Sequence, residues 1–269
     1  MTAAPTAPTG ATPRGVPANG KCTARRCCSG GTVTPVTSVA VYCLGGVRNE
    51  RREIQGISHL TQRMLLKGTR HRSAEHLADE LEFVGARYSP FTSKDLVGAT
   101  LSVLSRHLGK ALSLLAECIL EPAFLPEELD KERRIVLAEL RRRQDDSFTC
   151  AMDLSEAALY RRHPYRFSVG GTQASLQRLQ TETLTRWHHR LYSPDRMVVA
   201  VVGDLRSRHL RDLVVEAFAP LDRPPRVLPE PALEDPPSSP RCRVRRRNKR
   251  HMALALSFMG PDFASGDFF

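Results

Sequence analysis

Short apolar segments typical of β-strands alternate irregularly along this chain with longer segments whose apolar residues recur at helical spacing. The strongest strand-like runs are 32–44 and 197–202. The clearest helix is expected to begin at Pro126, because proline suits the first position of a helix. Acidic residues follow this proline, and three arginines at 141–143 suit the negative end of the helix. Irregular alternation of this kind predicts an α+β fold, in which helices pack on an antiparallel-rich sheet.

Local signals place the remaining elements. Ser73 is expected to cap a helix that runs to Val84, and Gly85 is expected to end it. The spacing of apolar residues predicts one further strand region at 91–104. It also predicts helices at 57–66, 108–120, 151–160, 181–191 and 208–218.

Composition divides the chain into four parts. Residues 1–31 contain no Asp or Glu and are rich in Thr, Ala, Pro and Gly, which is typical either of a mitochondrial transit peptide or of a disordered tail. We therefore expect a mitochondrial protein or, failing that, a cytoplasmic one. Residues 32–220 are interpreted as the main domain and 221–240 as a proline-rich linker. Residues 241–269 are expected to begin a second domain, and 241–259 resume a strand pattern.

The formal net charge of +11 permits acidic partners. Aromatic residues make up only 6% of the chain, and no zinc-finger or RNA-binding motif occurs, which argues against nucleic-acid binding. No apolar run approaches the roughly 20 residues of a membrane span. The basic run 241–250 is either a charged edge strand or a patch for anionic lipid, acidic peptide or RNA, so any membrane contact is expected to be peripheral. Cysteines are odd in number and form no CxxC pair, which indicates reduced thiols.

One segment carries a resemblance. Residues 56–69 resemble the active-site helix of pitrilysin-type (inverzincin) metallopeptidases, a family that includes the mitochondrial processing peptidase subunits and the core proteins of respiratory complex III. The similarity continues in the segments 128–140 and 192–204 and covers about Val36 to Phe269, in order. The resemblance implies the fold of one peptidase-like half, with a second homologous half that is truncated here.

In this family, two histidines of an H-x-x-E-H helix hold zinc and the glutamate activates a water molecule. The resemblance assigns His59 to the first ligand, but Gln62 replaces the catalytic base and Arg63 replaces the second ligand. It also assigns Glu139 to the distal ligand and Glu132 to its supporting carboxylate. An amide cannot serve as the base and a guanidinium cannot bind zinc. Neither catalysis nor a zinc cofactor is therefore expected, although active relatives use zinc.

The resemblance also implies a place for peptide. Ser89 and Thr92 would lie beside the strand that an extended peptide joins, and Pro90 would remove a backbone donor there. Arg63 is counted with Ser89 and Thr92 among the expected binding residues. We also expect Arg63 to replace the metal by pairing with Glu139, rather than both side chains turning to solvent.

Three functions follow from these observations. The first is a non-catalytic subunit that forms a heterodimer with a homologous pitrilysin-type chain and serves as scaffold or peptide-binding partner of an active zinc peptidase or of complex III. The second is a zinc metalloendopeptidase with another ligand set, for which His71 and His76 are the nearest spare histidines. The third is a basic module for nucleic acid or membrane surfaces.

Overall fold

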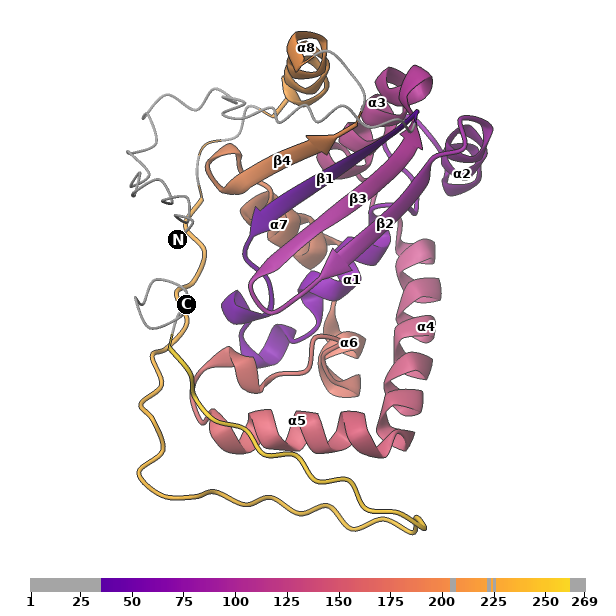
Figure 1. The fold of residues 1–269 in the computed structure, drawn as a ribbon. Helices are drawn as coiled ribbons and strands as arrows, with labels where there is room; N and C mark the ends of the chain where they lie inside the picture. The colour runs from indigo at the N-terminus through magenta and orange to yellow at the C-terminus, as the bar shows by residue number, and fades with distance from the viewer. Residues whose placement is uncertain (1–34, 204–206, 222–223, 225, 262–269) are drawn as a thin grey trace, which may run out of the picture.

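A four-stranded antiparallel sheet forms the centre of the molecule (Figure 1). The computed structural model describes residues 35–203, 207–221, 224 and 226–261. The strand order is β2-β3-β1-β4, and each neighbouring pair is antiparallel. The strands are β1 (Val36–Leu44), β2 (Arg87–Thr92), β3 (Leu96–Leu104) and β4 (Met197–Val202). The predicted α+β class is therefore confirmed.

Helices surround one face and one end of this sheet (Figure 1). The helix α1 packs against β2 and β3 and is flanked by α4 and α7, and α3 packs against β3. The helices are α1 (Ile57–Met64), α2 (Ala74–Phe83), α3 (Leu108–Leu120), α4 (Pro126–Asp145), α5 (Ser147–Leu159), α6 (Gln173–Arg178), α7 (Thr181–Leu191) and α8 (Ser207–Phe218). Short 3-10 turns lie at η1 (Val47–Asn49), η2 (Arg52–Ile54), η3 (Ser105–His107), η4 (Pro164–Arg166) and η5 (Pro194–Arg196).

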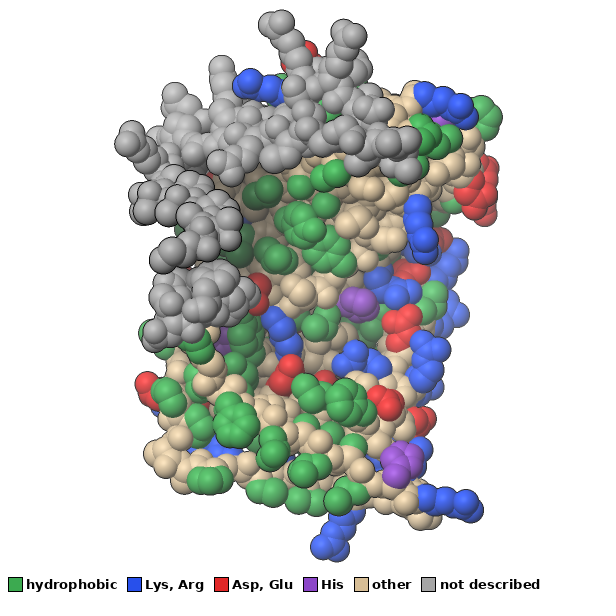
Figure 2. Space-filling view, in the orientation of Figure 1, with side chains coloured by type: hydrophobic (Ala, Val, Ile, Leu, Met, Phe, Trp, Pro, Cys, Tyr) green, Lys and Arg blue, Asp and Glu red, His purple; other side chains and the backbone are tan. Residues whose placement is uncertain are grey.

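The two faces of the sheet differ. Alternate residues of β1, such as Val39 and Val41, are fully buried against the helices. The residues between them reach the other face, where Tyr42, Val198 and Val202 are exposed. Figure 2 shows the hydrophobic side chains gathered over this side of the sheet. β4 is an edge strand, and its residues alternate between partly buried and exposed.

Several boundaries follow the local signals. Ser73 Oγ accepts a hydrogen bond from the His76 N–H and caps α2, and Gly85 follows that helix with a φ of +63°. The single strand region predicted at 91–104 is instead part of a hairpin of β2 and β3. The chain reverses between these strands, where the Ser93 N–H donates to the Leu96 carbonyl at 2.8 Å. The helix expected at 151–160 begins earlier, since Asp146 caps it through the Thr149 N–H.

The segment 241–259, predicted to form strand, has no assigned helix or strand. It runs beside α5 in an extended path (Figure 1), held by the Arg241 hydrogen bond to the Leu159 carbonyl at 2.7 Å. Its alternating residues Leu254, Leu256 and Phe258 are exposed. No neighbouring strand lies beside this segment among the described residues. A strand needs such a neighbour to complete its backbone hydrogen bonds, so the segment is extended without forming a strand.

Two arginines of the basic run 241–250 face acidic side chains: Arg241 lies 3.8 Å from Glu234, and Arg247 lies 3.8 Å from Asp145. Over the described part of the chain, no helix is both long enough and apolar enough to cross a membrane. The predicted tail 1–31 lies outside the described residues. The boundaries predicted at 32–220, 221–240 and 241–269 remain predictions.

Candidate functional site

The start of α1 is fixed by a buried carboxylate. Glu50 accepts hydrogen bonds from the N–H groups of Gly56 and Ser58 at 2.8 and 2.9 Å. The first N–H groups of a helix lack partners within it, so this carboxylate satisfies two groups that would otherwise be orphaned. Burial raises the pKa of Glu50 to about 7, against the opposing effect of these hydrogen bonds. Sequence reasoning missed Glu50, although it is the first acidic residue before the helix.

Close backbone packing holds the same turn. Gly56 has a φ of +84°, and a Cβ built on it would lie 2.8 Å from the Gly170 carbonyl oxygen. Glycine is therefore required at this position by both its conformation and the space around it. The remainder of α1 carries the three residues of the degenerate motif.

His59 lies on the first turns of α1 and is largely buried. Burial, followed by the nearby charge of Arg63, lowers its pKa. The imidazole is therefore neutral at pH 7 and keeps the form in which histidine can bind a metal.

Gln62 is committed to the core. Its Nε2 donates to the Tyr192 hydroxyl at 2.8 Å, and that hydroxyl lies 3.0 Å from the Gln62 Oε1. Both side chains are buried, and burial raises the pKa of Tyr192 well above its usual value. A neutral amide paired with a neutral phenol offers no proton acceptor of the kind that a general base needs near pH 7. Sequence reasoning missed Tyr192, although it begins one of the matching segments.

Arg63 joins two carboxylates on α4. Its Nε donates to Glu132 Oε2 at 2.6 Å, and its Nη1 lies 3.1 and 3.3 Å from the two oxygens of Glu139. The predicted contact between Arg63 and Glu139 is therefore present. The shorter hydrogen bond, however, is to Glu132. Glu132 and Glu139 are seven residues apart on α4 and so share one face of that helix.

A fourth side chain, missed by sequence reasoning, completes the cluster. Lys67 Nζ lies 2.9 Å from Glu132 Oε1, so each oxygen of this carboxylate faces a cation. Lys67 lies four residues after Arg63, but α1 ends at Met64, so the turn that follows the helix and not helical periodicity brings Lys67 to Glu132. The side chain of Glu132 is only 2% exposed. Burial opposes its ionisation, but the hydrogen bonds from Arg63 and Lys67 outweigh this effect, and its pKa lies below the usual range.

These residues do not fit a zinc ion. Arg63 has no lone pair to offer and already occupies the oxygens of both carboxylates that face α1. Two cations and two carboxylates balance without a metal. In the described ranges, no three His, Cys, Asp or Glu side chains are grouped to hold a metal ion. The spare histidines pair with other groups: His71 lies 2.8 Å from Glu121, and His76 lies 3.4 Å from Glu80.

The residues expected beside a peptide lie on β2, which packs against α1. β2 is an edge strand, and the Ser93 N–H just after it donates to the Leu96 carbonyl of β3, so the backbone groups of Ser89, two pairs further along, also face β3. Because backbone groups alternate sides along an antiparallel strand, Pro90 and Thr92 then face the open edge. Pro90 therefore lacks an N–H where an added strand would need a donor. The binding roles of Ser89, Thr92 and Arg63 stay predictions.

Residues 29–173 match the family described as Insulinase (Peptidase family M16), and residues 178–268 match the Peptidase M16 inactive domain. The chain belongs to the M16 peptidase family, and the resemblance that its sequence carries to pitrilysin-type peptidases is confirmed.

Individual relatives carry two kinds of name. An uncharacterized zinc protease of Bacillus subtilis is 31% identical over 176 residues, which is 65% of this chain and 43% of the relative. Subunit 1 of the mitochondrial cytochrome b-c1 complex of Rattus norvegicus is 26% identical over 240 residues, covering 87% of this chain and 49% of that subunit.

Solved structures support the same fold. The crystal structure of a protease from Helicobacter pylori superposes with a TM-score of 0.72 at 25% identity, over 77% of this chain and 51% of the other. A peptidase M16 inactive domain from Pseudomonas fluorescens gives 0.71 at 24% identity and covers 78% and 50%. The chain spans about half the length of these relatives.

Proposed function

We propose that this chain is a non-catalytic member of the M16 family, a pseudo-peptidase subunit. The observation that carries the proposal is the Arg63 guanidinium bound between Glu132 and Glu139. Zinc-dependent hydrolysis needs a metal that lowers the pKa of bound water and a base that takes the proton. A permanent cation stands at the second ligand position here, and an amide stands at the position of the base.

The role that this chemistry leaves is structural. We infer that the chain acts as a scaffold or peptide-binding partner in a heterodimer with a homologous M16 chain, either an active zinc peptidase or a subunit of complex III. The relationship to subunit 1 of the cytochrome b-c1 complex supports a subunit role. The apolar open face of the sheet, which includes Tyr42 and Val198, supplies surface for assembly. A mitochondrial location is proposed on the acid-poor residues 1–31 and on this relative.

Elemental analysis of the purified chain tests the proposal. We expect no stoichiometric zinc and no cleavage of unstructured peptides. A matched variant with Gln62→Glu and Arg63→His restores the H-x-x-E-H pattern and is expected to bind zinc more tightly than the wild type. Adding His59→Ala to that variant should abolish the gain. One zinc per wild-type chain together with chelator-sensitive cleavage would overturn the proposal and favour an active peptidase.

Assembly needs a separate measurement. Co-expression with each M16 homologue of the same cell, followed by size-exclusion chromatography, should yield a mixed complex. A chain that stays monomeric beside every such homologue would remove the subunit role and leave the catalytic conclusion untouched.

A further inference from the structure

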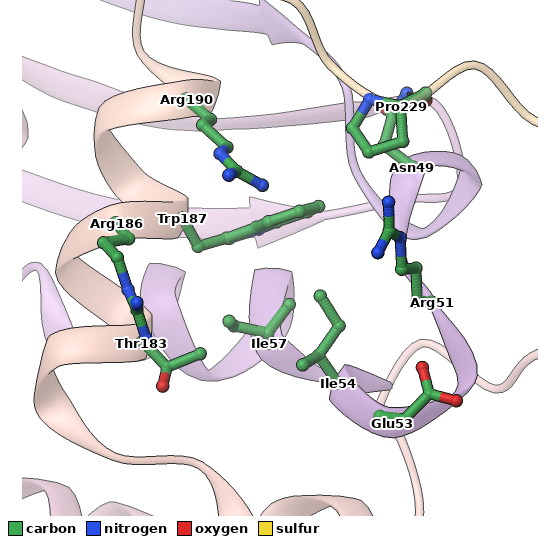
Figure 3. Close-up of a pocket in the computed structure, with 10 residues that line it drawn as sticks. All are labelled: Asn49, Arg51, Glu53, Ile54, Ile57, Thr183, Arg186, Trp187, Arg190 and Pro229. Carbon is green, nitrogen blue, oxygen red and sulfur yellow. Dashed lines mark hydrogen bonds between the residues drawn. The ribbon is translucent and has the colours of Figure 1, made fainter.

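The helix α1 packs against α4 on one side and against α7 on the other (Figure 1). A hollow of about 370 Å³ lies there between the segment 49–57 and α7, with Pro229 at its rim. Its floor is apolar and consists of Ile54, Ile57 and the indole of Trp187 (Figure 3). A hollow of this size suits a small organic molecule rather than a chain.

Three arginines border the hollow. Arg51 and Arg190 direct their guanidinium groups over it from opposite sides, and Arg186 runs along α7 (Figure 3). Arg186 uses its Nε for a hydrogen bond to the Glu182 carbonyl, 3.3 Å away. Among the residues that the structure describes, no carboxylate lies within 4.0 Å of any of these three guanidinium groups. The lining includes one acidic residue, Glu53, so the local charge is about +2.

The indole is held in place. Trp187 Nε1 donates to Ser58 Oγ at 3.1 Å, and the side chain is almost fully buried. Its polar group is thus satisfied within the protein, and the small part of the ring that lines the hollow is apolar, as are Ile54 and Ile57 beside it. A flat apolar group packs well on such a surface. Guanidinium groups bind phosphate through paired, charge-assisted hydrogen bonds.

We propose that this hollow binds an organic phosphate monoester, with the phosphate between Arg51 and Arg190 and a flat apolar body against the floor of Ile54, Ile57 and Trp187. A phosphate monoester carries a charge of about −1.5 to −2 at pH 7, which matches the local excess of positive charge. A carboxylate supplies only half of that charge. The proposed site is independent of the remnant peptidase site and does not rest on its loss of zinc.

The chain contains a single tryptophan, Trp187, so fluorescence excited beyond the absorption of its five tyrosines reports on this hollow. The full chain is titrated with phenyl phosphate, inorganic phosphate, sodium benzoate and phenol. We expect a saturable change with phenyl phosphate. Inorganic phosphate lacks the ring, benzoate lacks the second negative charge and phenol carries no negative charge. Each of them should therefore bind at least about tenfold more weakly than phenyl phosphate.

Variants assign the binding to the named arginines. Arg190→Gln and Arg51→Gln should each weaken phenyl phosphate binding at least about tenfold. Arg190→Lys should fall between them and the wild type, because it keeps the charge but loses the paired hydrogen bonds. Arg211→Gln on α8, an exposed arginine outside the hollow, is the matched control and should bind as the wild type does. Circular dichroism melting confirms that each variant is folded.

Three outcomes would overturn the proposal. A fluorescence change that does not saturate would mean that no site exists. Equal affinity for benzoate and phenyl phosphate would remove the phosphate assignment. Folded Arg51→Gln and Arg190→Gln variants that bind as tightly as Arg211→Gln would show that the arginines do not form the site.

Discussion

Two groups of basic side chains flank α1, and they differ in how their charge is balanced. On the α4 side, Arg63 and Lys67 face Glu132 and Glu139, so the cluster is neutral within itself. On the α7 side, Arg51, Arg186 and Arg190 border an apolar hollow with no carboxylate in contact within the described part of the chain. The same side-chain type therefore meets carboxylate partners on one side of the helix, and no carboxylate of the described residues on the other.

Because of this difference, the two groups contribute differently to folding and to ligand binding. A charge that is matched by its own neighbours contributes to folding, and losing one member leaves its partners uncompensated. A charge that lacks such partners contributes little to folding but remains available to an outside anion. Substitutions on the α4 side should therefore change stability, and equivalent substitutions on the α7 side should change ligand binding.

The largest effect is expected when both cations of the α4 side are removed. Arg63→Met with Lys67→Met leaves the Glu132 carboxylate buried and unpaired, which should cost about 3–5 kcal/mol in the free energy of unfolding. Urea denaturation measures it. Arg186→Met with Arg190→Met is the matched control and should change the same quantity by less than about 0.5 kcal/mol. Equal losses in the two variants would erase the distinction between the sides.

Adding Glu132→Gln to the double methionine variant sharpens the test. The amide removes the buried charge while nearly preserving the shape, so most of the lost stability should return. If it does not return, the loss arises from packing of the long side chains and not from charge.

An intermediate effect is expected from pH, through the two buried carboxylates of the region. The pKa of Glu50 is raised to about 7, so the folded state holds a proton that the unfolded state releases near its usual pKa of 4.5. The contribution of Glu50 to stability should therefore fall as pH rises from 4.5 to 7, by about 1–3 kcal/mol. The pKa of Glu132 is lowered instead, so its contribution is present above pH 4.5 and is lost as pH falls through its folded value.

Urea denaturation between pH 4 and 8 separates the two carboxylates. Glu50→Gln should flatten the decline between pH 4.5 and 7, and Glu132→Gln should leave that decline in place. A decline that persists unchanged in Glu50→Gln would assign it to another group. Both carboxylates are buried, but only Glu132 has cations on its oxygens, which is the same contrast between matched and unmatched charge.

The smallest effect is expected for the partly exposed pair of Arg63 and Glu139. In a double-mutant cycle, Arg63→Ala and Glu139→Ala should each destabilise, and the double variant should cost less than their sum by about 0.5–1 kcal/mol. The coupling of Arg63 to Glu132 should be larger, because Glu132 is buried and the hydrogen bond is shorter. Strict additivity in both cycles would mean that the cluster does not act as a unit.

Local signals predicted much of the fold. The helix 108–120 and the helix 181–191 were predicted with the bounds that the structure has, because apolar spacing alone defines them. The capping serine and the final glycine of α2 act within a few residues of the helix they bound. The missed short helix α6 has too few residues to establish a period.

The site could be predicted only where a family resemblance supplied it. The resemblance predicts the pairing of Arg63 with Glu139, because it assigns both positions to zinc ligands. The contact between Gln62 and Tyr192, 130 residues apart, follows no local pattern. The hollow over Trp187 is made by segments far apart in the chain and could not be read from any one of them. The sequence at 241–259 shows the alternation of a strand. It does not show whether a neighbouring strand is present, and none lies there among the described residues.

Pro90 has a consequence for how molecules of this protein can associate. It lies on the edge strand β2, whereas the opposite edge strand, β4, runs without a proline from Met197 to Val202. Molecules that add to one another strand by strand need two receptive edges to grow without limit. A sheet with one receptive edge can join only β4 to β4, which closes a two-fold pair and leaves no end from which a fibre could lengthen.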